Sequence, residues 1–299
     1  MVGELNDILA RLESSLAPLR GGPRELSGGI TNRNFRVTLG DVDYVVRRPG
    51  KDTELLGIDR AAERLANEAA ARLGIAPPVA AVLDDCLVTR FVSASSPDAG
   101  ELADRVEELA RDLRAFHQCA VRLPSRFHVP DLLDDYAAIV RARGGTLPPE
   151  YAQAARVAAS ICAALALDTP RPCHNDLLAG NVIRARDGDR LLLVDWEYAG
   201  MGDPRFDLGN LSINNDFDQA TDERMLRAYY EAPPSESQRA ALKLMRVLSD
   251  AREAAWGIVQ GEVSELDFDF AAYAREHFQR LDATVCDPAF ERWLESARA

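Results

Sequence analysis

One irregular polar segment, residues 170–210, interrupts an otherwise helical second half of the chain and constrains the fold most. Its first part reads Cys-His-Asn-Asp-Leu-Leu-Ala-Gly-Asn, from Cys173 to Asn181. Two short apolar runs follow, separated by a turn-rich sequence that predicts a hairpin, and the second run ends at Asp195. The hairpin would return position 195 to the side of position 181.

These polar side chains meet the needs of phosphoryl transfer. A carboxylate must accept a hydrogen bond from an attacking hydroxyl, which fits Asp176 as the catalytic base. Mg²⁺ prefers oxygen ligands, which Asn181 and Asp195 can supply from two different elements. A single Asp at a strand end is usually structural, but the three together in this spacing favour catalysis. We expect His174 to be structural, bracing the loop.

The pattern of the chain predicts an α+β organisation with two lobes. A small β-rich lobe covers 1–92 and starts with a helix at 1–20, and a larger helical lobe covers 93–299. The expected strands of the small lobe are 34–39, 42–47, 80–83 and 87–92, and its helix is 60–73. Residues 93–97 predict a linker. The expected helices of the large lobe are 102–116, 131–142, 149–167, 218–230, 236–260 and 269–282.

Charge and cysteine usage exclude several classes of protein. A net charge of −13 argues against nucleic acid or an anionic membrane as a partner, although local arginines can still hold a phosphate. The five cysteines form no C-x-x-C pair and predict neither disulfides nor a zinc site. The N-terminus is acidic and unlike a signal peptide, and the most apolar stretch, 157–167, is too short to span a bilayer. We therefore expect a cytoplasmic protein.

Two stretches of the irregular segment carry a family resemblance. They read H-N-D-L-L-A-G-N and L-V-D-W-E-Y-A-G-M-G-D-P-R-F-D-L-G-N. They closely resemble the choline/ethanolamine kinase branch of the aminoglycoside-phosphotransferase-like superfamily, and bacterial choline kinases look most similar. The resemblance implies a protein-kinase-like fold, ATP, Asp176 as catalytic base, and Asn181 and Asp195 as Mg²⁺ ligands. It also implies that Asp207 braces the catalytic loop from a helix start, where a plain N-cap is the alternative.

The small lobe carries candidate nucleotide-binding residues before and within its strands. A Ser-Gly-Gly-Ile-Thr-Asn sequence could lay backbone N–H groups over phosphates, although Gly-Gly turns are common without a ligand. The candidates in this loop are Gly28, Gly29, Thr31 and Asn32. Residues 88–92 occupy the position of a hinge that offers backbone groups to adenine. The candidates there are Thr89, Phe91 and Val92.

Arg47 ends a predicted strand, where the choline-kinase-like pattern also has an arginine. Its guanidinium could hold phosphates bidentately, whereas strand alternation points Arg48 to the other face. Glu68, inside the small-lobe helix, is the expected ion-pair partner of Arg47. A solvated helix face is the alternative for Glu68, because Glu63 also lies nearby.

Candidates for acceptor recognition lie in the large lobe. A quaternary ammonium is recognised by aromatic faces and a carboxylate, because it donates no hydrogen bonds. Trp256 and Glu253 lie three apart on a predicted helix and share a face with Asp250, whereas Arg252 is expected off that face. Core packing is the alternative for Trp256. The other candidates for substrate contact are Glu197, Tyr198 and Asn214, with Tyr229, Tyr230, Tyr273 and Phe278 as additional walls that could equally be core.

Two departures from the eukaryotic choline kinases affect this pocket. Asn214 stands where those enzymes have an acidic residue, and Val259 stands where they have a second Trp. Asp216 or Glu253 could replace the missing charge. For Glu197, support of the residues that bind metal or substrate and plain structural hydrogen bonding stay equally open.

The sequence therefore predicts an ATP- and Mg²⁺-dependent kinase for the hydroxyl of a small cationic alcohol, first choline or ethanolamine. Thiamine or an aminoglycoside are alternative acceptors. A non-catalytic pseudokinase is disfavoured, because Asp176, Asn181 and Asp195 are all present. The expected partner is the small alcohol, without nucleic acid or membrane, and the expected state is a monomer or homodimer.

Overall fold

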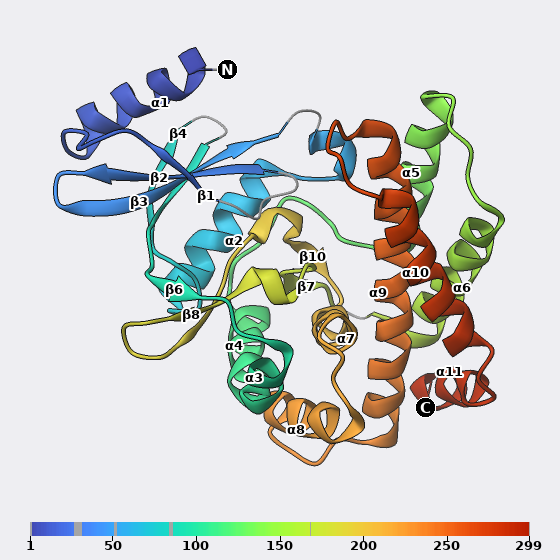
Figure 1. Ribbon diagram of the computed structural model, residues 1–299. Coiled ribbons are helices and arrows are strands. Elements are labelled where there is room, and N and C mark those ends of the chain that lie inside the picture. Colours follow the sequence, from blue (N-terminus) through green and yellow to red (C-terminus); the bar gives the residue numbers. More distant parts are fainter. Residues whose placement is uncertain (1, 27–31, 51–52, 84–85, 168, 299) are drawn as a thin grey trace.

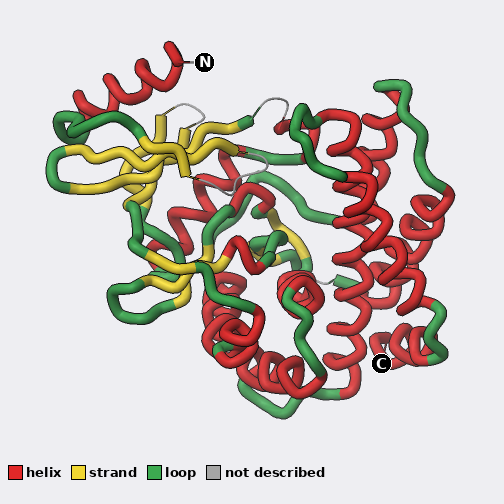
Figure 2. Tube along the Cα trace, in the orientation of Figure 1, coloured by secondary structure: helices red, strands yellow, loops and turns green. Residues whose placement is uncertain are grey.

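The computed structural model describes residues 2–26, 32–50, 53–83, 86–167 and 169–298. An antiparallel five-stranded sheet forms one side of the molecule, and most of the rest is helical (Figures 1 and 2). The spatial order of the sheet is β1-β2-β3-β5-β4, with bounds β1 Arg24–Leu26, β2 Asn32–Leu39, β3 Val42–Pro49, β4 Val79–Leu83 and β5 Cys86–Arg90. An antiparallel sheet with a mostly helical remainder is the α+β arrangement that the sequence predicts.

The hairpin between β2 and β3 begins the sheet. Leu39 pairs with Val42 across the turn, and Gly40 adopts a φ of 60°, a conformation that favours glycine. Alternate residues of both strands face helix α1 (Val2–Ser15), whose apolar side packs on the sheet. This register leaves Arg47 near the end of β3, opposite both Asn34 of β2 and Leu87 of β5.

Helix α2 (Arg60–Arg72) lies between the sheet and the helical part of the protein (Figure 1). The carboxylate of Asp59 caps its N-terminus, and the left-handed conformation of Gly74 follows its end. Its alanine-rich inner face packs against residues of the helical region. Glu63 lies on this buried face and is 3% exposed.

The helical region is built around the long helix α9 (Glu236–Val263), which contacts α5, α6, α7, α10 and α11. The other helices are α3 Ala99–Asp104, α4 Val106–Gln118, α5 Val129–Ala142, α6 Pro149–Leu165, α7 Pro204–Asn214, α8 Gln219–Tyr230, α10 Phe270–Val285 and α11 Ala289–Arg298. All helices expected from the apolar spacing are present, although the one expected at 102–116 is divided into α3 and α4, and α7 and α11 are additions. Among the described residues, no helix combines the length and apolar character needed to cross a membrane.

Two small sheets hold the irregular segment. Strands β8 (Val182–Ala185) and β9 (Leu191–Leu193) form the predicted hairpin, and β7 (Arg171–Cys173) pairs with β10 (Gly200–Gly202). Strand β6 (Ala94–Ser95) pairs with β8. The segment 93–97 is therefore partly a strand rather than only a linker, because backbone pairing with β8 supplies hydrogen bonds that its sequence does not reveal.

Helices α7 and α9 approach each other at Gly209. A Cβ atom at this position would lie 2.5 Å from the Cβ of Met245, which is closer than two side-chain carbons can approach. Beside this contact, the Asn210 amide donates to the hydroxyl of Ser249 at 2.9 Å. The absence of a side chain at Gly209 therefore allows the two helices to touch.

Candidate active site

Helix α7 anchors the loop that follows β7, residues 174–181, which we call the catalytic loop. Asp207, in the first turn of α7, accepts the backbone N–H groups of His174 at 2.8 Å and Asn175 at 2.7 Å. It also pairs with Nε2 of His117 at 2.8 Å. Burial alone would raise the pKa of Asp207, but these hydrogen bonds and the neighbouring histidines hold it below its ordinary value. The N-cap of α7 is Asp203, so Asp207 is not the plain cap.

His174 lies fully buried beneath the loop. Its Nε2 lies 3.0 Å from the carbonyl oxygen of Val194, and its ring packs on Trp196 with 4.4 Å between ring centroids. Burial lowers the pKa of His174, so the neutral ring is favoured. These contacts are those of a residue that supports the loop and the end of β9.

The three residues expected to carry catalysis and metal binding line one cavity. The amide nitrogen of Asn181 donates to the backbone oxygen and to Oδ2 of Asp176, both at 2.8 Å. The backbone N–H of Val194 donates to the carbonyl oxygen of Asn181 at 2.9 Å, which places Asp195 beside it. Asp195 itself adopts a left-handed conformation with φ 64°. The hairpin thus returns to the catalytic loop as predicted.

Burial raises the pKa of Asp176 to about 7, while Arg252 opposes this shift. The residue that supplies this positive charge lies on α9, far along the chain. The carboxylate is thus withdrawn from water and kept near a cation, an environment in which a buried acid acts as a base near neutral pH.

Arg47 binds a different glutamate from the one expected. Its Nη1 lies 2.7 Å from Oε1 of Glu63, and its Nη2 lies 2.7 Å from Oδ1 of Asp195. Glu68 instead pairs with Arg64 at 3.3 Å. The assignment of Glu68 to Arg47 is wrong because five helical residues rotate the side chain by about 140°, away from the buried face that carries Glu63.

A second arginine, Arg60, joins the sheet side of the site to the residues after β9. It lies 2.7 Å from Oε2 of Glu63 and 3.7 Å from Oε2 of Glu197, and donates to Oδ1 of Asn32 at 3.2 Å. The amide nitrogen of Asn32 donates to Glu197 at 2.7 Å. Sequence reasoning missed Arg60, although its position three residues before Glu63 was a usable signal. Gly28, Gly29 and Thr31 lie outside the described residues.

Glu197 is almost completely buried in this network. Burial raises its pKa to about 8, and the negative charge of Asp195 adds to the shift. The hydrogen bond with Asn32 links it to the start of β2. Together with Asp176 it also lines a cavity beside α9. Its bond with Asn32 is structural hydrogen bonding, one of the two roles left open for it.

A cavity of about 450 Å³ lies between the sheet and the residues after β9. Arg47, Asn181 and Asp195 line it side by side, with Arg47 in contact with Asp195. The expected hinge residues Thr89, Phe91 and Val92 line the same space. The cavity therefore gathers the described candidates for nucleotide binding, with the exception of Glu68 and of Asn32, which is buried in the network with Arg60.

A second cavity of about 210 Å³ continues from the first toward α9 and α10. Gly180, Asn181 and Asp195 line both cavities. The inner cavity also contains Asp176, and its aromatic walls are Tyr198, Trp256, Phe268 and Tyr273. The indole N–H of Trp256 donates to the Tyr198 hydroxyl at 2.8 Å, which fixes two of these walls against each other.

The charges of the inner cavity differ from the expectation. Arg252 lies in it, because residues four apart on a helix share a face and Arg252 therefore lies beside Trp256. Glu253 is bound on both oxygens, by Arg252 at 2.7 Å and by the Tyr273 hydroxyl at 2.7 Å. Asp250 faces away and pairs with His277 at 2.9 Å. The sequence interpretation therefore placed both Arg252 and Asp250 on the wrong helix face.

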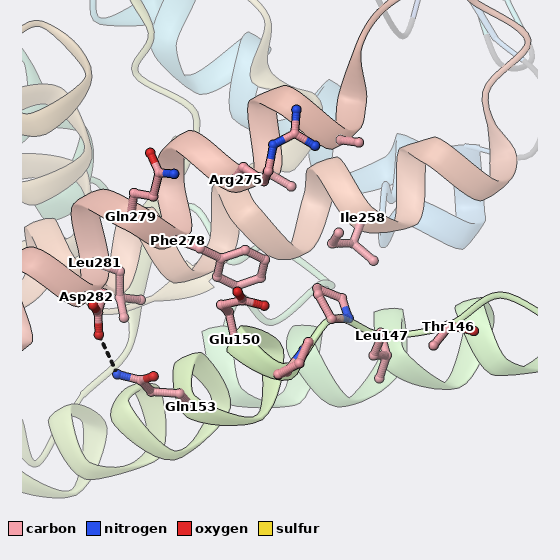
Figure 3. Close-up of a pocket in the computed structure, with 14 residues that line it drawn as sticks. Thr146, Leu147, Glu150, Gln153, Ile258, Arg275, Phe278, Gln279, Leu281 and Asp282 are labelled. Atoms are coloured by element: carbon pink, nitrogen blue, oxygen red, sulfur yellow. Dashed lines mark hydrogen bonds between the residues drawn. The ribbon is translucent and has the colours of Figure 1, made fainter.

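Other expected substrate contacts lie elsewhere. Asn214 and Asp216 do not line the inner cavity. Tyr229 bonds His117 at 2.8 Å beneath the catalytic loop. Phe278 lines a separate cavity of about 680 Å³ between α6 and α10, where it faces Glu150 (Figure 3). Phe268 was not expected from the sequence, because it lies in a short loop without helical spacing.

Comparison with known proteins agrees with this arrangement. The profile described as "Phosphotransferase enzyme family" matches residues 23–242. A crystal structure of a choline/ethanolamine kinase family protein from Mesorhizobium loti is 31% identical, covers 98% of this chain and 99% of its own, and has a TM-score of 0.82. The choline kinase LicA from Streptococcus pneumoniae is 25% identical, with 95% and 99% coverage and a TM-score of 0.77. Protein LicA of Haemophilus influenzae is 26% identical over 276 residues, which are 86% of this chain and 77% of that protein.

The fold and the match over most of the chain define a phosphotransferase that acts as a small-molecule kinase. Within this class, the chain belongs to the choline/ethanolamine kinase family.

Proposed function

We propose that the protein transfers the γ-phosphoryl group of ATP, with Mg²⁺, to the hydroxyl of a small cationic alcohol, first choline or ethanolamine. The observation that carries this proposal is the meeting of two cavities at Asn181 and Asp195, with Asp176 on the inner side. A nucleotide in the outer cavity and an alcohol in the inner one would meet at that junction. Holding two reactants in this way removes much of the entropic barrier to their reaction.

The outer cavity suits the phosphates of a nucleotide. Arg47 offers a guanidinium that Glu63 holds in place, and such a group binds phosphate oxygens bidentately. Thr89, Phe91 and Val92 line this cavity and would lie beside the base. The family membership of the chain supports the nucleotide assignment.

Asn181 and Asp195 fit a hard divalent cation. The amide nitrogen of Asn181 is directed to Asp176, which leaves the amide oxygen for another partner. Asp195 adds a carboxylate that borders both cavities. Oxygen donors of this kind suit Mg²⁺, which would neutralise phosphate charge there when bound.

Asp176 would accept the hydrogen bond of the acceptor hydroxyl and orient it toward the junction. The faces of Trp256, Phe268 and Tyr273 would hold the cationic end of the alcohol. The negative charge of the whole protein attracts a cation toward the cavity. These features favour an amino alcohol over a neutral one.

The test is ADP release with Mg·ATP in the presence of choline, ethanolamine, thiamine or an aminoglycoside. We expect choline or ethanolamine to stimulate ADP release, and Asp176→Asn to abolish the stimulation. Phosphorylated product is then identified by mass spectrometry. Stimulation by thiamine or the aminoglycoside alone would correct the acceptor, and no stimulation by any alcohol would contradict the proposal.

A further inference from the structure

One guanidinium connects the wall of the inner cavity to the catalytic loop. Nη1 of Arg252 lies 2.7 Å from Oε1 of Glu253 and 3.3 Å from Oδ1 of Asp176. Glu253 is held in turn by the hydroxyl of Tyr273, which donates to Oε2 at 2.7 Å. A continuous chain of polar contacts therefore runs from α10, through α9, to Asp176.

Both oxygens of Asp176 are engaged by neighbours. Oδ2 accepts from Asn181 at 2.8 Å, and Oδ1 faces Arg252. Two contacts on the two oxygens restrict rotation of the carboxylate about its Cβ–Cγ bond. Each carboxylate oxygen has two lone pairs, so the group can still accept a hydrogen bond from an alcohol. An alcohol that enters the cavity meets an oriented acceptor.

A contribution to the stability of the fold does not readily explain why the guanidinium of Arg252 is buried. Its side chain is 2% exposed, and its Nε and Nη2 atoms are buried without a hydrogen-bond partner in the described structure. Buried donors without partners destabilise a fold. Stacking of the guanidinium on Tyr198, 4.3 Å from the ring centroid, offsets part of this loss. Apolar residues of similar size in place of both Arg252 and Glu253 would fill the same space without buried charges or unpaired donors.

We propose that Arg252 is a positioning residue, which holds the Asp176 carboxylate in the orientation that receives the acceptor hydroxyl. Glu253 and Tyr273 hold Arg252 in place. The inference rests on the proposed role of Asp176 and adds a residue that acts through it. Because Arg252 acts on the orientation of another side chain, its loss lowers kcat more than it weakens binding.

The test compares the parent with Arg252→Met and Arg252→Lys by steady-state ADP release with Mg·ATP and choline or ethanolamine. Arg252→Met is expected to lower kcat at least about tenfold, with the KM values of alcohol and ATP within about threefold. Arg252→Lys keeps a donor and a positive charge, and is expected to recover most of the loss. A kcat within twofold of the parent for Arg252→Met would overturn the proposal, as would a raised alcohol KM at unchanged kcat.

Arg246→Met is the matched control in the same helix. Arg246 donates to Ser212 at 3.0 Å and to Asp222 at 3.1 Å, and it does not line the inner cavity. We expect its kcat to equal that of the parent, whatever its effect on stability. If Arg252→Met does not fold, Glu253→Gln breaks the same chain with less change in shape and is expected to show the same split between kcat and KM.

A crystal structure of Arg252→Met separates this inference from the proposed function. The Asp176 carboxylate is expected to rotate away from its parent position. If none of the four alcohols stimulates ADP release by the parent, the proposed function is contradicted, and the carboxylate orientation still decides the positioning role. An unchanged Asp176 side chain in Arg252→Met would overturn that role even if the parent is active.

Discussion

Arg47 and Asp195 form a 2.7 Å ion pair that joins the end of β3 to the loop after β9. The same guanidinium binds Glu63 on α2, and both groups of the pair are largely buried. Arg47 therefore lies against the carboxylate that we propose as a metal ligand. The phosphates of a bound nucleotide would compete with Asp195 for this guanidinium, whereas Glu63 would continue to hold it.

Replacement of Glu63 tests this arrangement. Glu63→Gln is expected to raise the KM for ATP about tenfold, because Arg47 loses its buried anionic partner. Glu68→Gln is the matched control in the same helix, since Glu68 pairs with Arg64 at a partly exposed surface and contributes little. Steady-state kinetics with varied ATP measures both. If Glu68→Gln raised the KM for ATP more than Glu63→Gln did, Glu68 would be the functional partner of Arg47.

Asp176→Asn is expected to lower kcat at least about 10²-fold, because the amide cannot take the proton of the alcohol hydroxyl. Nucleotide affinity, measured by calorimetry, is expected to stay within threefold of the parent, because Asp176 lines only the inner cavity. A variant that lost ATP binding to the same extent would instead show that the substitution had disturbed the whole site.

The loop aromatic Phe268 offers a test of cation recognition without disturbing the core. It lines the inner cavity and is 45% exposed. Phe268→Leu is expected to raise the KM for choline about threefold to tenfold, as loss of one cation–π contact predicts. Leu266→Ala, two residues away and exposed, is the control and is expected to leave this KM unchanged. Equal values for both variants would remove Phe268 from the acceptor site.

Asp207 and Asp203 begin the same helix but have different environments. Asp207→Ala is expected to lower the free energy of unfolding by about 3 kcal/mol or more, since it leaves His117 and two backbone N–H groups buried without their acceptor. Asp203→Ala removes a helix cap and is expected to lower it by about 1 kcal/mol. Urea unfolding of both variants measures the difference. Similar values would mean that Asp207 contributes no more than a cap.

The candidate site was predictable where its residues are close in the sequence. Asp176, Asn181 and Asp195 are joined by one loop and one hairpin, so turn chemistry and strand length determine their approach. Helix periodicity likewise predicted the large-lobe helices other than α7 and α11, because their apolar faces pack on a common core. The additional strand β6 was not predictable, because its two residues are held by pairing with a distant segment.

Contacts between distant helices were harder to predict. The choice between Glu63 and Glu68 depends on which face of α2 meets the sheet, and the sequence pattern alone did not decide it. Arg252 was misplaced because a buried arginine is uncommon, and only the fold shows that Asp176 and Glu253 compensate it. The glycine-rich loop through Gly28, Gly29 and Thr31 stays a prediction.

The close approach of α7 and α9 at Gly209 links the position of the catalytic loop to that of the acceptor wall. Helix α7 carries the anchors of the catalytic loop, and α9 carries Arg252 and Trp256 in the acceptor wall. Because their backbones meet directly, even an added methyl group at position 209 would wedge the helices apart and displace base and acceptor wall together. Gly209 would therefore determine the distance between the Asp176 loop and the acceptor wall, although it contacts neither.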